Sequence, residues 1–269
     1  MLVSVICTVR NGENTISYTI DSVINQTFKE WEMIIIDDGS TDRTAVILKE
    51  YQSKDKRIKV ISSGGMGRAK SLNMAINNAK GEYIANIDAD DLMHPEKLEC
   101  QVDIISENKS FFLVSTLSEL IYDDEKPNWK DIKCGNNLLT FIDHKLLFRN
   151  RISHSSVLIN KNELIKLGAY NIDRKSQLDY ELWLRALLSN KKMGIIESKL
   201  TAKRIHSNQS FENKKRLKYT YNSMLLQMKF MILSKQYIYY LPLPVISFFV
   251  SLLPFSYRRK ISSIVFKEK

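Results

Sequence analysis

Three carboxylates stand within four positions of the stretch YIANIDADDLMHP, residues 83–95. Asp88, Asp90 and Asp91 follow an apolar run that is typical of a buried strand. On an extended segment alternate side chains point the same way, so Asp88 and Asp90 could converge on one cation. Their oxygens suit Mg²⁺ or Mn²⁺, which commonly complete their shell with substrate phosphates. The alternative is an acidic turn in which Asp90 or Asp91 caps a helix that starts near Pro95.

Two further polar stretches could contact a nucleotide. In IIIDDGSTDRT, Asp38 ends an apolar run and precedes a glycine and a helix start, which suits recognition of ribose hydroxyls or a base edge. The same stretch also fits a helix cap, and the two roles are compatible. In SSGGMGRAKSLN, Arg68 and Asn73 could contact a diphosphate or a sugar. That stretch matches neither of the well-known phosphate loops, and a flexible turn fits it equally well.

Three residues of the second half could act on an acceptor or on a metal. Asp179 heads the stretch LDYELWLRALL, where it could be a general base, although an Asp at a helix start also needs no catalytic role. His206, in RIHSNQS, could be a third metal ligand or a phosphate contact. His154, in RISHSS, is interpreted as an acceptor-side contact. For both histidines the alternative is a solvated loop residue.

The elements that must position these residues alternate along the first half of the chain. Strands are expected at residues 2–9, 31–39, 58–62 and 82–88, and helices at 15–27, 40–55 and 68–81. Ser40 or Thr41 is expected to cap the second helix, and Gly81 to end the third. The alternation predicts a parallel sheet covered by helices on both faces. Ligands bind beyond the carboxyl ends of such strands, where Asn11 and the acidic residues fall.

The second half is less regular. A helix is expected at 95–108, a strand or strand pair at 110–122, and a strand with a short helix that ends near Gly168. A further amphipathic helix should begin just before Asp179. Together these patterns predict an α/β fold with a mixed, mostly parallel, Rossmann-like sheet.

Composition limits the class of protein. The 269 residues are 44% hydrophobic and 26% charged, which is ordinary for a globular protein. The first residues lack the features of a signal peptide. Cys7, Cys100 and Cys134 are far apart and form no CxxC pair, which argues against a disulfide framework or a zinc site and fits a reducing cytosol.

Positive charge is concentrated near the C-terminal end. The net charge is +10, yet residues 199–269 alone carry 14 Lys or Arg against 2 Asp or Glu. A near-neutral body with a basic tail indicates an anionic partner, either acidic phospholipid or nucleic acid. Nucleic-acid binding calls for interleaved basic and aromatic residues. Residues 236–257 are instead uncharged throughout, so we expect no nucleic acid.

That uncharged segment is long enough to span a membrane, but Pro242, Pro244 and Pro254 should break a continuous helix. We therefore expect the tail, residues 211–269, to lie in the membrane interface as a helical segment with residues 258–260 near lipid phosphates. A core helix with a basic, solvated end and a spanning helix are the alternatives.

In their order along the chain, these stretches resemble the family 2 glycosyltransferases. The likeness extends over residues 2–210 and is carried by VSVICTVRNGENTISYTIDSVINQTFKEWEMIIIDDGSTDRT, by GRAKSLNMAINNAKGEYIANIDADDLMHPEKLECQV, and by ISHSSVLINKNELIKLGAYN with QLDYELWLR. The resemblance implies a GT-A domain over 1–210, with a nucleotide-sugar half at 1–95 and an acceptor half at 96–210.

The resemblance also implies roles for individual residues. Those expected beside the nucleoside, ribose or metal are Thr8, Asn11, Asp38 and Asp88. Asp90 would be the principal metal ligand, with His206 completing the site, and Asp179 would be the base. Leu178 departs from the family pattern, because many members have an acidic residue there. The QxxRW pattern of processive members is absent, which favours addition of a single sugar.

The activity implied is inverting, metal-dependent transfer from a nucleotide-diphosphate sugar, with UDP as the default nucleotide. The acceptor would be a lipid-linked saccharide at the cytoplasmic face of the membrane, in bacterial surface-polysaccharide synthesis. The alternative is a catalytically silent nucleotide-binding or membrane-docked protein of the same fold. A sugar-phosphate nucleotidyltransferase is disfavoured, because TVRNGEN after the first strand is a poor phosphate loop.

Overall fold

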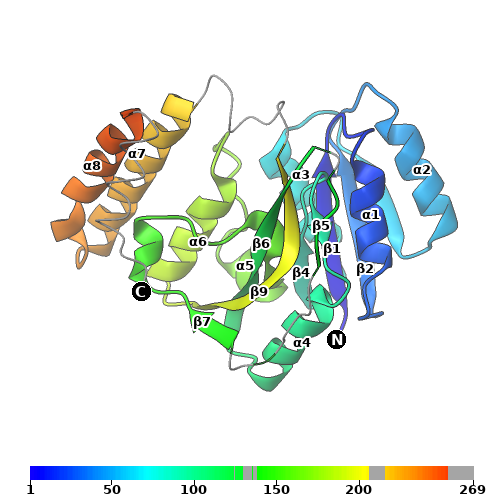
Figure 1. The fold of residues 1–269 in the computed structure, drawn as a ribbon, viewed down its shortest axis with the longest axis horizontal. Coiled ribbons are helices and arrows are strands. Elements are labelled where there is room, and N and C mark those ends of the chain that lie inside the picture. Colours follow the sequence, from blue (N-terminus) through cyan, green and yellow to red (C-terminus); the bar gives the residue numbers. More distant parts are fainter. Residues whose placement is uncertain (124, 130–134, 136–137, 206–215, 254–269) are drawn as a thin grey trace. The chain divides into compact units, whose positions relative to one another are not determined.

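The computed structural model describes residues 1–123, 125–129, 135, 138–205 and 216–253 (Figure 1). The chain divides into two compact units: unit 1 comprises 1–143 and 151–206, and unit 2 comprises 144–150 and 207–269. The domain boundary predicted at residue 210 lies outside the described residues, so that division stays a prediction. The short segment 144–150 belongs to the C-terminal unit.

The first half of unit 1 alternates strands and helices as predicted. In order these are β1 (Val3–Val9), α1 (Ile16–Ile24), β2 (Trp31–Asp37), α2 (Thr44–Lys54), β3 (Ile58–Ser62), α3 (Arg68–Asn78) and β4 (Tyr83–Asn86). β1 lies between β2 and β4 and pairs in parallel with both, and β3 extends the parallel sheet beyond β2. The buried face of α1 carries Ile16, Ile20 and Val23, as the helical spacing indicated.

The second half turns the sheet into a mixed one. Its elements are β5 (Leu92–Met93), α4 (Lys97–Glu107), β6 (Phe111–Tyr122), β7 (Leu139–Phe141), η3 (His154–Ser156), β8 (Leu158–Asn160), α5 (Lys161–Lys166), α6 (Leu178–Leu188) and β9 (Lys192–Ile205). Among the described residues the strand order is β3-β2-β1-β4-β8-β6-β9-β5, with β7 beside β9. β8 runs antiparallel to β4 and β6. Helices flank the sheet (Figure 1), which confirms the predicted α/β fold class.

The start of α2 differs from the prediction. The helix begins at Thr44, and neither Ser40 nor Thr41 caps it. The reason is the Asp37 carboxylate, whose Oδ1 accepts a hydrogen bond from Ser40 N at 2.9 Å and holds the preceding residues in a turn. Asp42 then accepts from Thr44 N at 3.0 Å. The polar residues after β2 therefore shape a turn before the helix starts.

Gly81 does not end α3, because that helix stops at Asn78 with Ala79 as its cap. A Cβ at Gly81 would lie only 2.6 Å from Ser4 N of β1. The glycine is therefore needed where two backbone segments approach closely, and its role is packing, not helix termination.

The cysteines also differ in part from the expectation. Cys7 is a free, buried thiol in β1. Cys100 is disulfide-bonded, which the argument against a disulfide framework did not anticipate. Spacing along the chain does not show which cysteines come within bonding distance after folding.

Lys97, at the start of α4, is completely buried, and within the described part of the chain its Nζ has no hydrogen-bond partner. Burial lowers the pKa of this ammonium group to about 7, since desolvation disfavours the charged form. Between pH 7 and 10 the unfolded chain therefore binds more protons, and wild-type stability should rise with pH. We expect Lys97→Met to raise the free energy of unfolding by roughly 2–4 kcal/mol at pH 6 and to flatten this rise.

Urea denaturation at pH 6, 7.5 and 9 measures both effects. Lys49→Met, which replaces an exposed lysine of α2, is the control and should leave the pH dependence unchanged. A Lys97→Met variant less stable than wild type at pH 6 would contradict an uncompensated buried charge.

Unit 2 contains, among its described residues, η2 (His144–Leu147), α7 (Arg216–Ser234), η4 (Ile238–Tyr240) and α8 (Pro242–Leu252). Gln227 of α7 donates from Nε2 to Phe148 O at 2.9 Å, which ties the segment 144–150 to this helix. Pro242 and Pro244 stand in the first turn of α8, where a missing N–H costs no helical bond. These two prolines therefore mark the start of α8, and the described part of the uncharged segment forms no continuous helix, as predicted. Within the described ranges no helix is both long and apolar enough to cross a bilayer.

Candidate active site

The predicted ligand residues meet at one edge of the sheet. In the parallel pairing Val9 lies opposite Asp37, and Ile6 lies opposite Asn86, so β1, β2 and β4 end close together. Asp38 N donates to Val9 O at 2.8 Å just beyond the paired residues. The carboxyl ends of these strands thus bring the acidic groups after β2 and β4 to a common edge, as expected for a ligand site of an open parallel sheet.

The acidic triplet forms a turn rather than an extended segment. Asp91 N donates to Asp88 O at 3.2 Å, so the alternation of side chains expected for a strand does not apply there. Asp88 and Asp90 are half-buried, whereas Asp91 is only 2% exposed. The turn therefore leaves two carboxylates within reach of a ligand and places the third inside the fold.

Asp91 links the turn to two distant segments. Its Oδ2 accepts from Ser155 Oγ at 2.5 Å, and its Oδ1 accepts from Arg204 N of β9 at 3.0 Å. Burial, together with the charges of Asp88 and Asp90, raises the pKa of Asp91 well above its usual value. Asp91 does not cap α4, whose N-cap is Glu96. Its role is to fix the turn.

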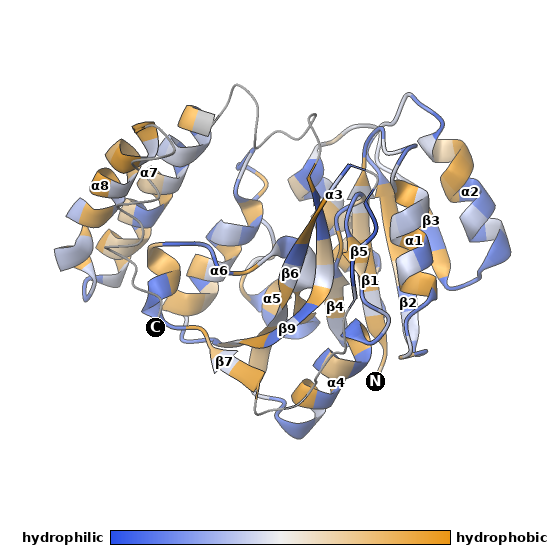
Figure 2. Ribbon diagram, in the orientation of Figure 1, coloured by the Kyte–Doolittle hydropathy of each residue, from blue (hydrophilic) through white to orange (hydrophobic). Residues whose placement is uncertain are grey.

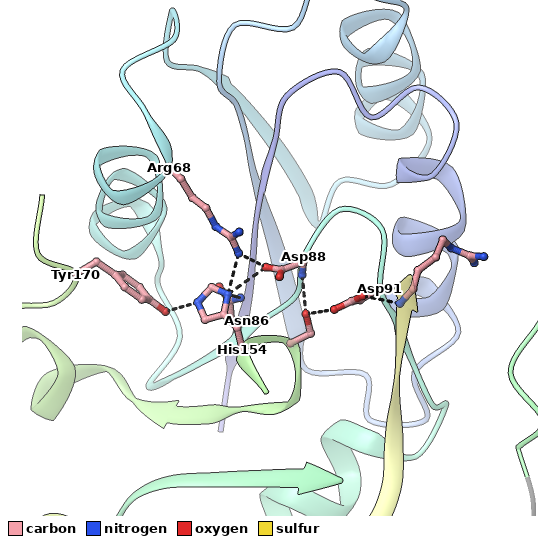
Figure 3. A network of polar contacts seen from close by, with 8 residues as sticks. Arg68, Asn86, Asp88, Asp91, His154 and Tyr170 are labelled. Atoms are coloured by element: carbon pink, nitrogen blue, oxygen red, sulfur yellow. Dashed lines mark hydrogen bonds and ion pairs between the residues drawn. The ribbon is translucent and has the colours of Figure 1, made fainter. Parts of the chain in front are cut away.

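Asp88 lies at the centre of a polar network (Figure 3). Its Oδ1 accepts from Arg68 Nη2 at 2.5 Å and lies 3.0 Å from His154 Nδ1. Burial opposes the charged form, but the charges of Arg68 and His154 outweigh it and hold the pKa of Asp88 well below its usual range. Asp88 in turn raises the pKa of Arg68. The network therefore presents an ionised carboxylate and a permanent cation side by side.

His154 connects Asp88 to Tyr170 and Asn86. It is 8% exposed, its Nε2 lies 2.8 Å from Tyr170 Oη, and Asn86 Nδ2 lies 2.7 Å from its Nδ1. The solvated-loop interpretation is therefore wrong. The structure instead places His154 against Asp88, and a direct contact with the acceptor stays a prediction. Sequence reasoning missed Tyr170, because no local pattern distinguishes it from the other tyrosines.

Asp38 organises the glycine-rich loop. Its Oδ1 accepts from Ser63 Oγ at 2.7 Å, from Ser71 Oγ at 3.0 Å and from Gly67 N at 3.1 Å. Gly67 has a φ of +94°, which favours glycine, and the next residue, Arg68, opens α3. The hydrogen bonds of Asp38 to the loop thus help to position Arg68 at the sheet edge. The predicted contact of Asp38 with a nucleoside stays a prediction.

Asn73 is occupied by the fold. Its Nδ2 donates to Tyr170 O at 2.8 Å, and its Oδ1 accepts from Tyr170 N at 2.9 Å. This amide therefore holds the segment before α6 against α3, and its predicted contact with a diphosphate or a sugar stays a prediction. Asn11 similarly joins two loops, since its Oδ1 accepts from Thr41 N at 2.8 Å. Thr8 lies in β1 opposite Ile36 of β2, and no contact of its side chain decides its role.

Asp179 stands in the first turn of α6, as predicted. Asp88 has the largest effect on the pKa of Arg68 and raises it, while burial lowers it. The negative charge of Asp179 raises the pKa of Arg68 further. Burial and then the charge of Asp179 raise the pKa of Tyr170. Residues from α3, the β4 turn and α6 therefore share one electrostatic environment. Leu178, in place of an acidic neighbour, is 8% exposed and belongs to the core.

Comparison with known proteins identifies the class of this site. The sequence profile of Glycosyl transferase family 2 matches residues 4–170, more than half of the chain. The chain belongs to this family. The match covers the strand ends, the acidic turn, His154 and Tyr170, and it confirms the resemblance inferred from the sequence.

Relatives of this family 2 glycosyltransferase occur in archaea and bacteria. An uncharacterized glycosyltransferase of Methanocaldococcus jannaschii is 34% identical over 230 residues, covering 83% of this chain and 78% of the relative. The putative teichuronic acid biosynthesis glycosyltransferase TuaG of Bacillus subtilis is 35% identical over 187 residues, covering 69% and 72%. Both relatives are described as glycosyltransferases, and the name of one of them refers to teichuronic acid synthesis.

Solved structures support the fold of the family 2 glycosyltransferase. S. aureus TarS 1–349 in complex with UDP-GlcNAc superimposes with a TM-score of 0.72 at 18% identity, covering 95% of this chain and 77% of that one. At this identity the likeness shows the GT-A fold alone.

Of the three metal ligands predicted for this family 2 glycosyltransferase, the structure describes Asp88 and Asp90. His206 lies outside the described residues. Among the described residues no three His, Cys, Asp or Glu side chains form a ready-made metal cluster. The carboxylates of Asp88 and Asp90 nevertheless fit a hard cation, because both are half-buried on one turn and carboxylate oxygens are the ligands that such cations prefer. Mg²⁺ is typically held by one or two carboxylates plus substrate phosphates, which suits this arrangement.

Proposed function

We propose that the protein transfers one sugar from a nucleotide-diphosphate sugar, with UDP favoured, to a hydroxyl of a lipid-linked saccharide in bacterial surface-polysaccharide synthesis. The observation that carries this proposal is the network at the sheet edge, where Asp88, Arg68 and His154 are in contact and Asp179 lies within electrostatic range. TarS, which has the same fold, is solved with UDP and with UDP-GlcNAc, and this supports a UDP-sugar donor.

Asp179 is proposed as the general base. Its carboxylate accepts the proton of the acceptor hydroxyl as that oxygen bonds to the anomeric carbon of the donor. The bond from that carbon to the diphosphate breaks on the opposite face, and the nucleoside diphosphate leaves with the bonding electrons. One displacement of this kind inverts the configuration at the anomeric carbon.

The donor half of the site is proposed to stabilise the negative charge of the diphosphate. Asp90 and Asp88 would hold Mn²⁺ or Mg²⁺, with His206 as a further ligand, and such an ion stabilises a departing diphosphate. The Arg68 side chain is 52% exposed, so its guanidinium can reach a bound phosphate while it stays paired with Asp88. Thr8, Asn11 and Asp38 are proposed to line the nucleoside side.

We infer that the enzyme works at the inner face of the cell membrane, where a lipid-linked acceptor would be held, with residues 1–210 as the catalytic domain and 211–269 as the membrane-associating tail. A catalytically silent, nucleotide-binding relative is the second candidate. It is favoured only by Leu178, which removes the acidic neighbour of Asp179 found in many members.

Thermal stability in the presence of nucleotides tests the donor site. UDP with Mn²⁺, at one hundred times its dissociation constant, should stabilise the wild type by about 2.7 kcal/mol. EDTA should remove the stabilisation, and so should Asp90→Asn, because each removes the cation or its ligand. GDP, dTDP and CDP, each tested in the same way, identify the nucleotide.

Asp103→Asn, an exposed carboxylate of α4, is the matched control and should keep the full shift. If no nucleotide stabilises the wild type with or without metal, the transferase proposal fails. A nucleotide shift that survives both EDTA and Asp90→Asn would refute the proposed metal site while keeping nucleotide binding.

A further inference from the structure

Helix α8 exposes an apolar side that the other described residues of unit 2 leave uncovered. Leu243, Ile246 and Phe249 are 42%, 55% and 61% exposed, and their spacing of three residues places them on one side of the helix. No residue of α8 is charged. Monomeric proteins in water rarely leave a contiguous apolar surface uncovered, so this helix indicates an interaction site.

Helix α7 continues the apolar surface. Leu217, Tyr221 and Leu225 follow one another at intervals of four residues and are 60%, 47% and 45% exposed. Near Leu225 an apolar groove of about 400 Å³ runs toward Ile232. The ring of Tyr221 packs edge-on against Phe248 of α8 with centroids 5.9 Å apart, which joins the two helices. Figure 2 shows hydrophobic residues along both α7 and α8.

The charge of unit 2 selects among possible partners. Its described residues carry six Lys or Arg and no Asp or Glu. Lys229 lines the apolar groove itself, and Lys235 directly follows α7. A second copy of the chain would bring two basic units together, which like-charge repulsion disfavours. Exposed Leu, Ile and Phe beside basic residues instead match an anionic lipid surface.

We propose that α7, η4 and α8 form a docking surface for an anionic bilayer, with α8 lying in the membrane interface. With 11 residues α8 is about 16 Å long, roughly half of the hydrocarbon thickness of about 30 Å, so it lies in the bilayer surface and does not cross it. Tyr239 and Tyr240 of η4 are 87% and 42% exposed and suit the headgroup level. The inference rests on the proposed membrane location of the enzyme, and it is independent of the sugar and nucleotide.

Vesicle co-sedimentation of the full chain tests this docking surface. The wild type should bind vesicles of 30% phosphatidylglycerol in phosphatidylcholine at least tenfold more strongly than vesicles of pure phosphatidylcholine. The double variant Ile246→Glu, Phe249→Glu should lose at least tenfold of this binding, because it places charges on the apolar side of α8. Lys229→Gln with Lys235→Gln should weaken binding severalfold and reduce its dependence on salt.

Val46→Glu is the matched control, because Val46 is an exposed apolar residue of α2 in unit 1, and it should bind like the wild type. The thermal shift with UDP and Mn²⁺ should persist in the Ile246→Glu, Phe249→Glu variant, which separates failure of docking from failure of the donor site. Equal binding by that variant and the wild type would overturn the proposal. The proposal would also be overturned if light scattering showed that the wild type is a dimer without lipid and that the Ile246→Glu, Phe249→Glu variant is a monomer. That result would assign the surface to a second copy of the chain.

Discussion

Replacement of Asp179 by Asn is expected to lower kcat by a factor of about 10²–10⁴, because general base catalysis contributes an acceleration of that size. The Asn side chain is isosteric but cannot accept the proton of the acceptor hydroxyl at neutral pH. The donor contacts come from other elements, α3 and the β4 turn, so the thermal shift with nucleotide and metal should remain. Release of nucleoside diphosphate, with membrane lipid extract as the source of acceptor, measures the rate.

Asp173→Asn is the matched control for this variant. Asp173 is exposed in the loop before α6, and its carboxylate should be dispensable for the transfer. If Asp179→Asn retained more than a tenth of the wild-type rate, another group would have to act as the base. If it lost nucleotide binding as well, its role would lie in the donor site and not in proton transfer.

Loss of the Asp88 carboxylate is expected to have the second large effect. Asp88→Asn should lower kcat/KM by at least 100-fold and abolish the thermal shift with UDP and Mn²⁺, because it removes both a proposed metal ligand and the partner of Arg68. The effect on folding should be small, about 1 kcal/mol, since the two side chains are 27% and 52% exposed and water screens their attraction. Chemical denaturation separates this small loss from the loss of binding.

A double-mutant cycle with Arg68→Gln tests whether the two side chains act as a unit. The two substitutions should be non-additive in kcat/KM by about 0.5–3 kcal/mol, the range found for residues in direct contact. Glu163→Gln is the control, because Glu163 is ion-paired with Lys166 and Lys191 but lies in α5. Additive effects of the Asp88 and Arg68 substitutions would show that the observed ion pair has no part in donor binding.

Periodicity along the chain was sufficient to predict the elements of the first half of unit 1. The buried stripe of α1 and the apolar strands are local patterns, and such patterns report which side of an element faces the core. Parallel strands then bring their carboxyl ends together, which is why Asp38 and Asp88 could be placed at one edge before the structure was known. The order of the motifs also identified the family correctly. The surrounding structure, more than the local sequence, set the helix ends at Thr44 and Asn78.

The tertiary structure alone decided what several residues do, because their partners are far away in the sequence. Asp91 bonds to Ser155 and to the backbone of Arg204, 64 and 113 positions distant. His154 reaches Asp88 across 66 positions, although its own sequence neighbourhood favoured a solvated loop. The sequence by itself determined the elements of the first half, the charged edge and the basic tail, since each follows from residue type and spacing. Contacts between remote segments depend on how the elements pack, and a local pattern does not encode that packing.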